Sequence, residues 1–394
     1  MSEIRVDSIG NESNTGGPVL SGITTFSGQQ YFIPPKGTTA ERPSDCPPGS
    51  IRFNTDTAHL EYWQGTVWLE FEASSEELGG SLTGAATTFS TNGTGHRGVI
   101  MGEATPNNEM EFLTISTLGN TQDFGTLTRS NSVSNAGFGS RTRGFAAAGG
   151  SNEVATTDTF VFASTGNATS FGDVTQARRN GSAVASSTRG ILGGGWGPAG
   201  GGDPNGYVTT IDYCTMATTG TWQDFGDLLF EIEFIGQSAA ASSVRGVWAG
   251  GATSSPSPGT RVNTIQYVTI STTGSSLDFG DLTQTKNQLG AVGSSTRAVF
   301  AGGSDPGVNG NIDFITIAST GNSQDFGDLA TPRRSFGSPT SPTRGLFMGG
   351  YIPAASRNIE YITIATTGNG QEFGEITNQT RRRSGSCSNG HGGL

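Results

Sequence analysis

Residues 297–328 read RAVFAGGSDPGVNGNIDFITIASTGNSQDFGD, and this stretch decides the fold because close variants of it recur along the chain. It begins with an arginine and a short apolar run that ends in Gly302-Gly303. A second apolar run follows at Ile312–Ala318, and the stretch closes on Phe-Gly-Asp. A fixed period of roughly 20 to 50 residues is the usual mark of a solenoid, a propeller or another repeat array.

Two markers recur in step along the chain. The first is Phe-Gly-Asp or a close variant, at spacings of 47 or 54 residues. Its aromatic residues are Phe124, Phe171, Phe225, Phe279, Phe326 and Phe373. The second is a short apolar strand led by an arginine, and these arginines are Arg97, Arg143, Arg189, Arg245, Arg297 and Arg344. Six copies of each marker predict six equivalent units.

The segments between the markers are typical of β-strands. Ile312–Ala318 and Ile359–Ala365 are rich in β-branched and aromatic residues and carry apolar groups on both faces. Thr-Gly-Asn, as at Thr320–Asn322, predicts a hairpin because glycine readily adopts positive φ. We interpret Asp-Phe-Gly-Asp as a turn whose phenylalanine fills the space between neighbouring sheets. Small residues before the Arg-led strands suit an innermost strand, where sheets crowd a central axis.

This order of elements, with Gly-Gly pairs at 149-150, 250-251, 302-303 and 349-350, resembles the kelch repeat over roughly residues 80–394. The resemblance implies an all-β fold, a six-bladed kelch-like β-propeller over residues 93–394. Residues 381–393 read as one more inner strand. We predict that this tail completes the first blade beside Arg97–Gly102, since an open ring would leave a sheet edge exposed.

The N-terminal part does not share the period. Residues 51–71 predict a small three-stranded meander with turns at Thr55-Asp56 and Gln64-Gly65. A proline-stiffened arm, residues 34–43, precedes it. Residues 76–92 are poor in bulky apolar side chains and are interpreted as a linker.

The N-terminal string is similar to segments in tail-fibre and other virion proteins of tailed phages. There, a Lys-Gly-Thr-Thr-Ala-x-Arg-Pro arm, here residues 36–43, precedes an Ile-Arg-Phe-Asn-Thr-Asp hairpin, here residues 51–56. The Phe-Gly-Asp repeats also resemble those of virion proteins from phages of marine cyanobacteria. The resemblance implies a virion protein of the tail or tail fibre, assembled in the host cytoplasm. Residues 1–75 would attach it to other virion proteins, and a homotrimer is implied by the same resemblance.

Composition narrows the classes of partner. The formal net charge of -11 and the pI near 4.8 argue against nucleic acid, because phosphate binding depends largely on Lys and Arg. No stretch approaches the roughly 20 apolar residues that span a bilayer, so membrane insertion is not expected. Cys46, Cys214 and Cys387 lie far apart and form no metal-binding or disulfide pattern. No cofactor or metal site is predicted.

Catalytic motifs have simpler interpretations here. Asp-Phe-Gly would mark a magnesium loop in a protein kinase, but it recurs here without the other kinase motifs. The aspartates flanking Phe225, Phe279 and Phe326 leave calcium binding open as an alternative to turn capping. Three histidines are too few for a copper oxidase, and a Ser/His/Asp triad lacks a plausible base. We expect no enzyme, although paired carboxylates keep a polysaccharide-degrading propeller open as an alternative.

The units differ in the connection after Gly-Gly, which is long at Trp196–Tyr207 and at Thr253–Asn263. These connections are predicted to lie on one face of the propeller. Binding of host surface glycan or a partner protein is predicted for Trp196, Tyr207, Arg261 and Tyr351, with variable solvent loops as the alternative.

The Arg-Arg pairs at 178-179 and 333-334, and the run 381–383, are predicted to begin inner strands and bind backbone or acids. A basic ring that faces a receptor is the alternative. The predicted function is a virion structural protein whose propeller serves interaction or host recognition; a glycan receptor-binding protein is the runner-up.

Overall fold

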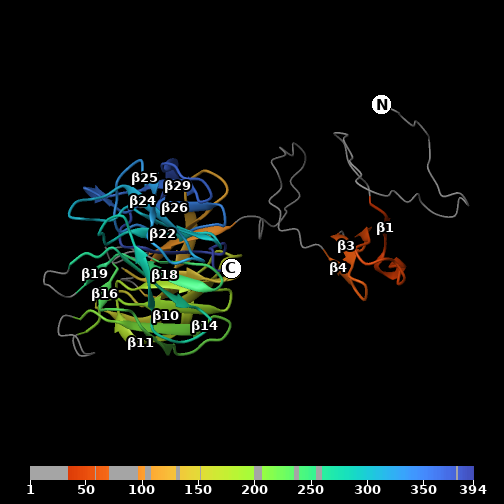
Figure 1. Cartoon of the computed structure of the whole chain (residues 1–394), viewed down its shortest axis with the longest axis horizontal. Coiled ribbons are helices and arrows are strands. Elements are labelled where there is room, and N and C mark those ends of the chain that lie inside the picture. Colours follow the sequence, from red (N-terminus) through yellow and green to blue (C-terminus); the bar gives the residue numbers. More distant parts are fainter. Residues whose placement is uncertain are drawn as a thin grey trace, which may run out of the picture. The chain divides into compact units, whose positions relative to one another are not determined.

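The computed structural model describes residues 34–57, 59–70, 96–102, 108–129, 134–150, 152–198, 206–234, 239–253, 260–378 and 380–394. Regular structure in these ranges is β-strand, apart from one short 3-10 turn at Thr39–Glu41. The all-β class predicted from the sequence is therefore confirmed. The chain divides into two compact units, Met1–Leu78 and Gly79–Leu394 (Figure 1). The predicted linker, residues 76–92, lies outside the described residues.

The first unit contains one sheet, in which the predicted meander is confirmed and the arm adds a strand. Its strands, in spatial order, are β1 (Lys36–Gly37), β2 (Ile51–Asn54), β3 (His59–Trp63) and β4 (Trp68–Glu70). Strands β2, β3 and β4 pair antiparallel, whereas β1 from the arm pairs parallel to β2.

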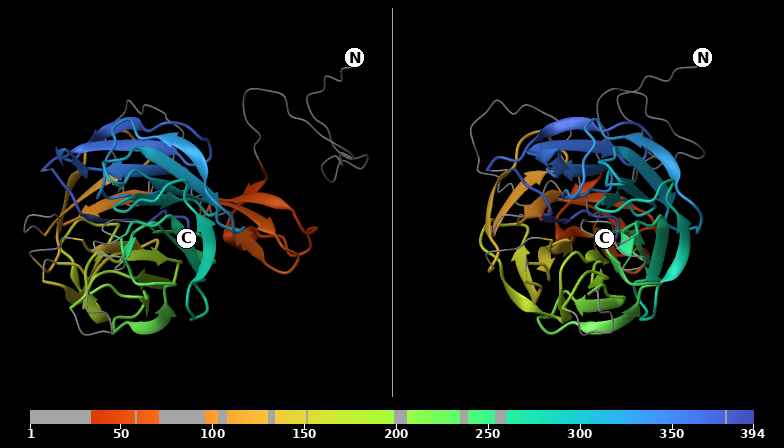
Figure 2. Two further views of the ribbon diagram at one scale, coloured as in Figure 1. Left: turned by 60° about the vertical axis from the view of Figure 1, so that its left-hand side comes forward. Right: turned by 90° about the vertical axis from the view of Figure 1, so that its left-hand side faces the viewer.

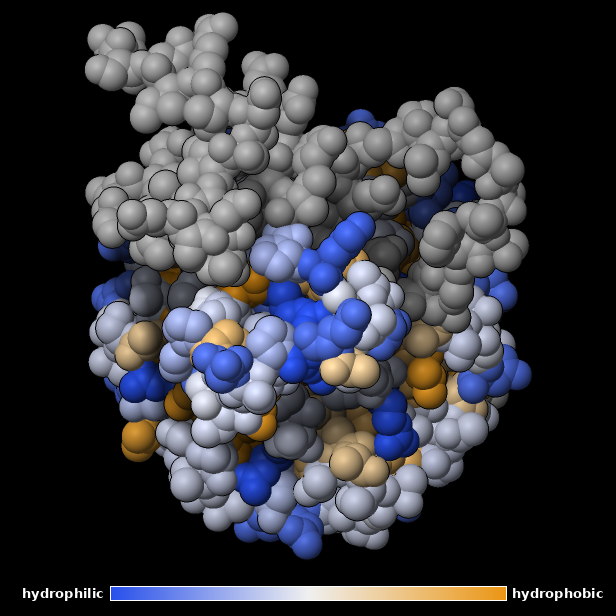
Figure 3. All heavy atoms as spheres, turned by 90° about the vertical axis from the view of Figure 1, so that its right-hand side faces the viewer, coloured by the Kyte–Doolittle hydropathy of each residue, from blue (hydrophilic) through white to orange (hydrophobic). Residues whose placement is uncertain are grey.

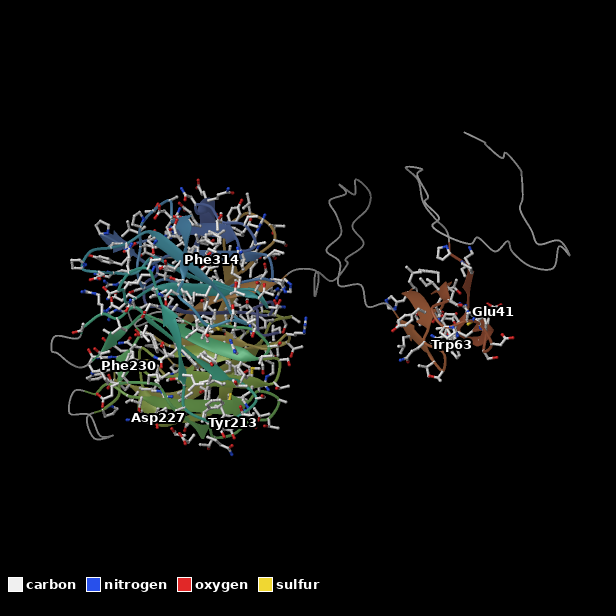
Figure 4. The ribbon with its side chains drawn as sticks, viewed as in Figure 1. Glu41, Trp63, Tyr213, Asp227, Phe230 and Phe314 are labelled. Atoms are coloured by element: carbon white, nitrogen blue, oxygen red, sulfur yellow. The ribbon has the colours of Figure 1, made fainter. Side chains whose placement is uncertain are left out.

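A buried carboxylate fastens the arm to this sheet. Glu61 accepts hydrogen bonds from Arg42 Nη2 at 2.6 Å and lies 3.3 Å from Arg52 Nε. Burial would raise the pKa of Glu61, but the hydrogen bonds from Arg42 and Asn54 and the charges of Arg42 and Arg52 together outweigh it, so the pKa is lowered. The Trp68 indole N–H donates to the Pro43 carbonyl at 2.9 Å. The arm therefore covers the polar face of the meander; Figure 4 labels Glu41 from the arm and Trp63 from β3.

The second unit repeats one sheet plan six times. Sheet 1 contains β31 (Gly385–Ser388), β5 (Arg97–Met101), β6 (Glu109–Thr114) and β7 (Gln122–Thr126). Sheet 2 contains β8 (Ala136–Gly139), β9 (Arg143–Ala147), β10 (Val154–Val161) and β11 (Thr169–Arg178). Sheet 3 contains β12 (Ser182–Ala185), β13 (Arg189–Gly193), β14 (Thr210–Thr215) and β15 (Gln223–Asp227). Sheet 4 contains β17 (Ala239–Ala241), β18 (Arg245–Ala249), β20 (Thr264–Thr269) and β21 (Leu277–Asp281). Sheet 5 contains β22 (Gly290–Gly293), β23 (Arg297–Ala301), β24 (Asn311–Thr316) and β25 (Gln324–Asp328). Sheet 6 contains β26 (Arg344–Met348), β29 (Asn358–Thr363) and β30 (Gln371–Glu375).

The innermost position of sheet 6 is held by residues 337–340, in which Gly337 and Thr340 bridge Met348 and Gly345. Two short ladders complete the unit. They are β16 (Ile232–Glu233) with β19 (Ala252–Thr253), and β27 (Tyr351–Ile352) with β28 (Ala354–Ala355).

Sheet 1 joins the first strand of the second unit to its last strand. Its inner strand, β31, comes from the tail, and Cys387 lies opposite Val99 of β5. The predicted pairing of the tail beside Arg97–Gly102 is therefore confirmed. Figure 2, right, shows the sheets set around a common centre near the C-terminus.

We expected Asp-Phe-Gly-Asp to form a turn, and this was wrong. The motif lies in the outermost strand of each sheet. Its glycines adopt positive φ, for example 145° at Gly226, because the backbone of the next sheet approaches closely at this point. A Cβ on Gly226 would lie 2.5 Å from the Gly274 carbonyl carbon. The marker glycine is required by contact between sheets, and the preceding phenylalanine is almost fully buried there, as at Phe225 and Phe279.

The Phe-Gly-Asp marker therefore binds the hairpin of the neighbouring sheet. The glycine of each hairpin, which is Thr-Gly-Asn or a close variant, donates its N–H to the phenylalanine carbonyl of the preceding sheet. The pairs are Gly166 with Phe124, Gly220 with Phe171, Gly274 with Phe225, Gly321 with Phe279, Gly368 with Phe326, and Gly119 with Phe373. The last pair joins sheet 6 to sheet 1, so the series returns to its start.

The Arg-led strands make a second series of contacts between sheets. Each arginine lies over an aromatic ring of its own sheet and donates to a carbonyl of the next sheet; Arg143 lies over two such rings, Phe145 and Phe171. Arg189, for example, lies 4.5 Å from the ring centre of Tyr213 and donates to the Ile270 carbonyl at 2.8 Å. In the last sheet, Arg344 donates to the Ser116 carbonyl of sheet 1.

Buried ion pairs anchor the turn that enters each sheet. Arg178 contacts Asp212 at 2.9 Å in sheet 3, and Lys286 contacts Asp313 at 2.8 Å in sheet 5. Equivalent pairs are Arg333 with Glu360, Arg381 with Glu111, and, more loosely, Arg129 with Asp158. Sheet 4 differs, since the cation is replaced by buried Ile232 and the acid by buried Gln266. The apolar and neutral partners occur together, so neither sheet type leaves a lone buried charge.

Candidate binding face

The Arg-led strands define two ends of the second unit. They begin at what we call the arginine end (Arg97, Arg143, Arg189, Arg245, Arg297, Arg344) and finish at the glycine end (Gly102, Gly149, Gly194, Gly250, Gly302, Gly349). The described part of this unit starts at His96, at the arginine end. The glycine end is therefore opposite to the point where the chain enters.

The sequence-predicted binding residues lie at the glycine end, on equivalent hairpins. Trp196 and Tyr207 face each other across one hairpin of sheet 3, where their backbones bridge. Arg261 lies on the corresponding hairpin of sheet 4, opposite Ala252, and Tyr351 on that of sheet 6, opposite Ala355. The structure brings only Trp196 and Tyr207 together on one hairpin.

Each predicted aromatic or cationic residue has a partner of its own. The Arg179 guanidinium lies 4.4 Å from the ring centre of Trp196, and that of Arg334 lies 4.8 Å from the ring centre of Tyr351. Arg261 instead forms an ion pair with Asp305, 3.7 Å away. Arg179 also pairs with an acid, Glu153, at 3.0 Å, so the difference from Arg261 is that Arg179 and Arg334 each lie on an aromatic ring.

A chain of backbone hydrogen bonds runs across the centre of the glycine end and returns to its start. Each sheet contributes one residue whose N–H donates to the carbonyl of the preceding one. In order these residues are Ser134, Asn180, Phe234, Gln288, Ser335 and Arg383, and Ser134 closes the set by donating to Arg383. Five of the six adopt positive φ of about 55–61°. We call these six residues the backbone ring.

Sequence reasoning missed the backbone ring, although its signal exists. In five of the six sheets, the ring residue follows the buried cation of the ion pair, or the isoleucine that replaces it, by two residues. Asn180 follows Arg178 in this way, and Phe234 follows Ile232. The side chains of these residues share no chemistry, because the ring uses only backbone groups. A search by residue type therefore finds nothing at these positions.

The first and second arginines of each pair have different roles. Arg178, Arg333 and Arg381 are buried in the ion pairs described above. The residues that follow reach the glycine end, where Arg382 and Arg383 are exposed. The sequence predicted that these runs bind acids or backbone, and this holds for the first member of each run and also for Arg179, which contacts Glu153 at 3.0 Å.

Charges gather around the backbone ring. Burial lowers the pKa of Arg383, and the positive charges of Arg382, Arg179 and Arg334 lower it further, while Glu233 opposes them. Burial also raises the pKa of Glu233, although Asn180 donates to its carboxylate at 2.9 Å. This end of the unit therefore places several like charges near one another and one carboxylate among them.

The opposite end of the axis is filled by the tail. His391 Nε2 donates to the Gly139 carbonyl at 2.6 Å, and its Nδ1 accepts from the Gly393 N–H. Burial lowers the pKa of His391 to about 4. Between this tail and the backbone ring lies a cavity of about 50 Å³, lined by inner-strand residues such as Ala185 and Ala240. Its volume suits a few water molecules rather than a substrate.

The described residues offer little for catalysis. They include no group of three or more His, Cys, Asp or Glu side chains placed to hold a metal ion, the aspartates flanking Phe225, Phe279 and Phe326 included. Burial raises the pKa of the Cys214 thiol to about 12, which removes the thiolate at neutral pH. In the part of the chain that the structure describes, no helix has the length and apolar character to cross a membrane.

No protein-family model matches the sequence, and none of the curated proteins matches it.

Proposed function

We propose that the chain is a structural protein of a virus particle, of the tail or tail fibre. Its first unit docks to another particle protein, and its second unit is a six-bladed kelch-like β-propeller that serves interaction or host recognition. The similarity of residues 36–56 to arms of tailed-phage virion proteins supports the location. Sequence and backbone contacts support the propeller separately, as argued next.

The backbone ring is the observation that carries the propeller. Six residues, one from each sheet, are linked head to tail, and the last donates back to the first. The hairpin glycines and the Phe-Gly-Asp markers form a second returning series at the outer strands. Two such series at different distances from the centre are what equivalent blades around one axis require.

The outer face of the first unit supports docking. Register places Ile51, Tyr62 and Leu69 directly opposite one another across three strands, with Leu60 on the same face. Ile51 is 50% exposed, Leu60 41% and Leu69 37%. The other face of the sheet carries the buried Arg52 and Glu61. In a stable isolated meander the apolar face is buried and the polar face is exposed, and here the arrangement is reversed. We therefore assign another particle protein as the partner that covers this apolar face. Hydrophobic residues also reach the surface among hydrophilic ones in Figure 3.

Particle incorporation tests this function. We expect the full chain, but not a chain lacking residues 1–75, to co-sediment with assembled particles, while circular dichroism shows that the second unit stays folded. Ile51→Ser/Leu60→Ser/Leu69→Ser should reproduce the loss, because it removes the apolar face without removing the arm. Lys36→Gln, exposed in the same unit, is the matched control and should incorporate normally. Equal incorporation of the deleted chain would refute the proposal.

A glycan receptor-binding role is the second candidate. The cluster of Trp196, Tyr207 and Arg179 at the end opposite to chain entry favours it, because paired aromatic and guanidinium groups are frequent at recognition sites. Trp196→Ala should then abolish binding on a glycan array. Release of reducing sugar from host envelope material would instead support the polysaccharide-degrading alternative.

A further inference from the structure

Four arginines, Arg179, Arg334, Arg382 and Arg383, gather at the centre of the glycine end, in a chain whose formal net charge is -11. They outnumber the two carboxylates beside them, Glu153, which contacts Arg179 at 3.0 Å, and Glu233. Burial lowers the pKa of Arg383, and the positive charges of the other three arginines lower it further. Like charges held together lower stability unless another interaction offsets them. Such an arrangement is typical of a site that binds an anion.

The backbone ring fixes the order of these side chains. Ser335, Arg383, Ser134 and Asn180 are consecutive in the ring, and Arg334, Arg382 and Arg179 each precede a ring residue by one position. The arginines therefore form an arc over sheets 6, 1 and 3, with Ser134 of sheet 2 between them in the ring, and we call this group the arginine arc. The remaining ring members, Phe234 and Gln288, follow Glu233 and Asn287, so the other side of the ring carries no arginine at this position.

The two ends of the arginine arc are held in place by aromatic rings. Arg179 lies over Trp196 and also contacts Glu153 at 3.0 Å, while Arg334 lies over Tyr351. Stacking leaves the edge of a guanidinium group able to donate in its own plane. Arg382 and Arg383, in the middle of the arc, are exposed. A ligand would therefore meet positioned donors at both ends and accessible charges between them.

The geometry points to a binding site for an acidic polysaccharide, whose anionic groups pair with the arginine arc. A polymer fits better than a small anion because the arc extends over several sheets. Guanidinium groups bind carboxylate, sulfate and phosphate through paired hydrogen bonds. Trp196, Tyr207 and Tyr351 beside the arc offer faces for sugar rings. Nucleic acid is the other polyanion that an arginine cluster could bind, and the test below compares the two. This site deepens the host-recognition role proposed above and rests on it.

Binding to a purified probe tests the site. We expect the full chain to bind polygalacturonate, a polymer of carboxylate-bearing sugars, and not neutral dextran, in calorimetry at low salt. Arg382→Gln/Arg383→Gln should weaken binding at least tenfold. Arg141→Gln/Lys36→Gln, which removes the same charge from one exposed position at the arginine end and one exposed position in the first unit, is the matched control and should bind as the parent does.

Stability separates a binding role from a structural one. Because Arg383 is disfavoured by its neighbours, Arg383→Gln should keep or raise the melting temperature while binding is lost. A lower melting temperature with unchanged binding overturns the proposal. Tighter binding of a single-stranded DNA oligonucleotide than of polygalacturonate overturns it as well. Particle incorporation is unaffected by either outcome, so failure here is distinguishable from failure of the proposed function.

Discussion

At the scale of single residues, the repeat is maintained by positions where backbone or charge leaves no choice. The glycine of Phe-Gly-Asp is one, since the carbonyl of the next sheet occupies the place of a side chain. The acid of the third strand is another. It caps the entering turn, as when Thr175 Oγ1 donates to Asp212 at 2.6 Å, and it neutralises the buried cation. Residue identity at these positions follows from contact between sheets rather than from strand propensity.

Gly226→Ala should lower the free energy of unfolding by about 2–4 kcal/mol, because the new methyl group meets the Gly274 backbone and the positive φ becomes strained. Gly274→Ala is the matched control. Its φ of 153° carries similar strain, but nothing lies within 4 Å of its Cβ, so a loss of about 1 kcal/mol is expected. Urea unfolding measures both, and equal losses would contradict the explanation by contact.

Sheet 4 supplies the design of a second test. Lys286→Ile should cost about 3–5 kcal/mol, because Asp313 stays buried without its cation. Lys286→Ile/Asp313→Gln copies the Ile232 and Gln266 combination and should recover most of the loss. In sheet 4, Gln266 accepts from Ser276 Oγ at 2.7 Å. The equivalent Ser323 Oγ is buried and has no hydrogen-bond partner among the described residues, so a glutamine at position 313 gains a donor. A double variant no more stable than Lys286→Ile would exclude this interpretation.

At the scale of strands and turns, the sequence predicted the strands of the second unit better than the contacts between its sheets. The period, the inner-strand position of the tail and the meander of the first unit follow from patterns of apolar residues and glycine, and these were right. The role of Asp-Phe-Gly-Asp was wrong, because a strand with a glycine at positive φ has the composition of a turn. The reason for that glycine lies in the next sheet, which the local pattern does not contain.

The candidate site shows the same limit. The residues that follow Gly-Gly could be placed on equivalent hairpins from the lengths of the connections. Whether Arg261 or Arg179 keeps its charge available could not be predicted, since Asp305 and Trp196, their partners, are contacts across strands. The backbone ring is absent from the sequence pattern because its members share backbone geometry and no side-chain type.

The tail gives a pH-dependent prediction at this scale. In the folded protein, burial lowers the pKa of His391 to about 4, whereas in the unfolded chain it titrates near 6.5. The unfolded state therefore binds the proton first as pH falls, so stability is lost between about pH 6.5 and pH 4. His391→Gln, which keeps a donor to the Gly139 carbonyl, should flatten this part of the curve. Melting temperatures of both proteins between pH 4 and pH 7 measure it, and identical slopes would count against it.

At the scale of the whole second unit, noncovalent contacts join its first strand, β5, to its last strand, β31. β31 pairs with β5, and Arg381 contacts Glu111 at 2.8 Å. Gly119 and Arg344 join sheet 6 to sheet 1 in the same way as the other sheets are joined. The junction thus uses the same contacts as the other sheets, and in addition the inner strand of sheet 1 comes from the C-terminal tail.

Val99→Cys should make this junction covalent. Cys387 lies directly opposite Val99, and opposed residues of antiparallel strands have Cα atoms about 4.5–5.5 Å apart, which a disulfide spans. Oxidation should lower the mass by two hydrogen atoms and stabilise the unit by up to about 5 kcal/mol. The same change in a Cys387→Ser chain is the control and should show neither effect. Failure of the thiols to pair under oxidising conditions would contradict the register of β31 and β5.

The position of β31 also sets a timetable. Its partner β5 is made about 280 residues earlier, so at roughly 5–20 residues per second a ribosome leaves that edge unpaired for about 15–60 s. During translation β5 pairs only with β6 until β31 has been made, whereas the later sheets are already complete. Nascent chains in this interval are the species most open to pairing with a wrong strand, which makes chaperone dependence a property of synthesis rather than of the finished fold.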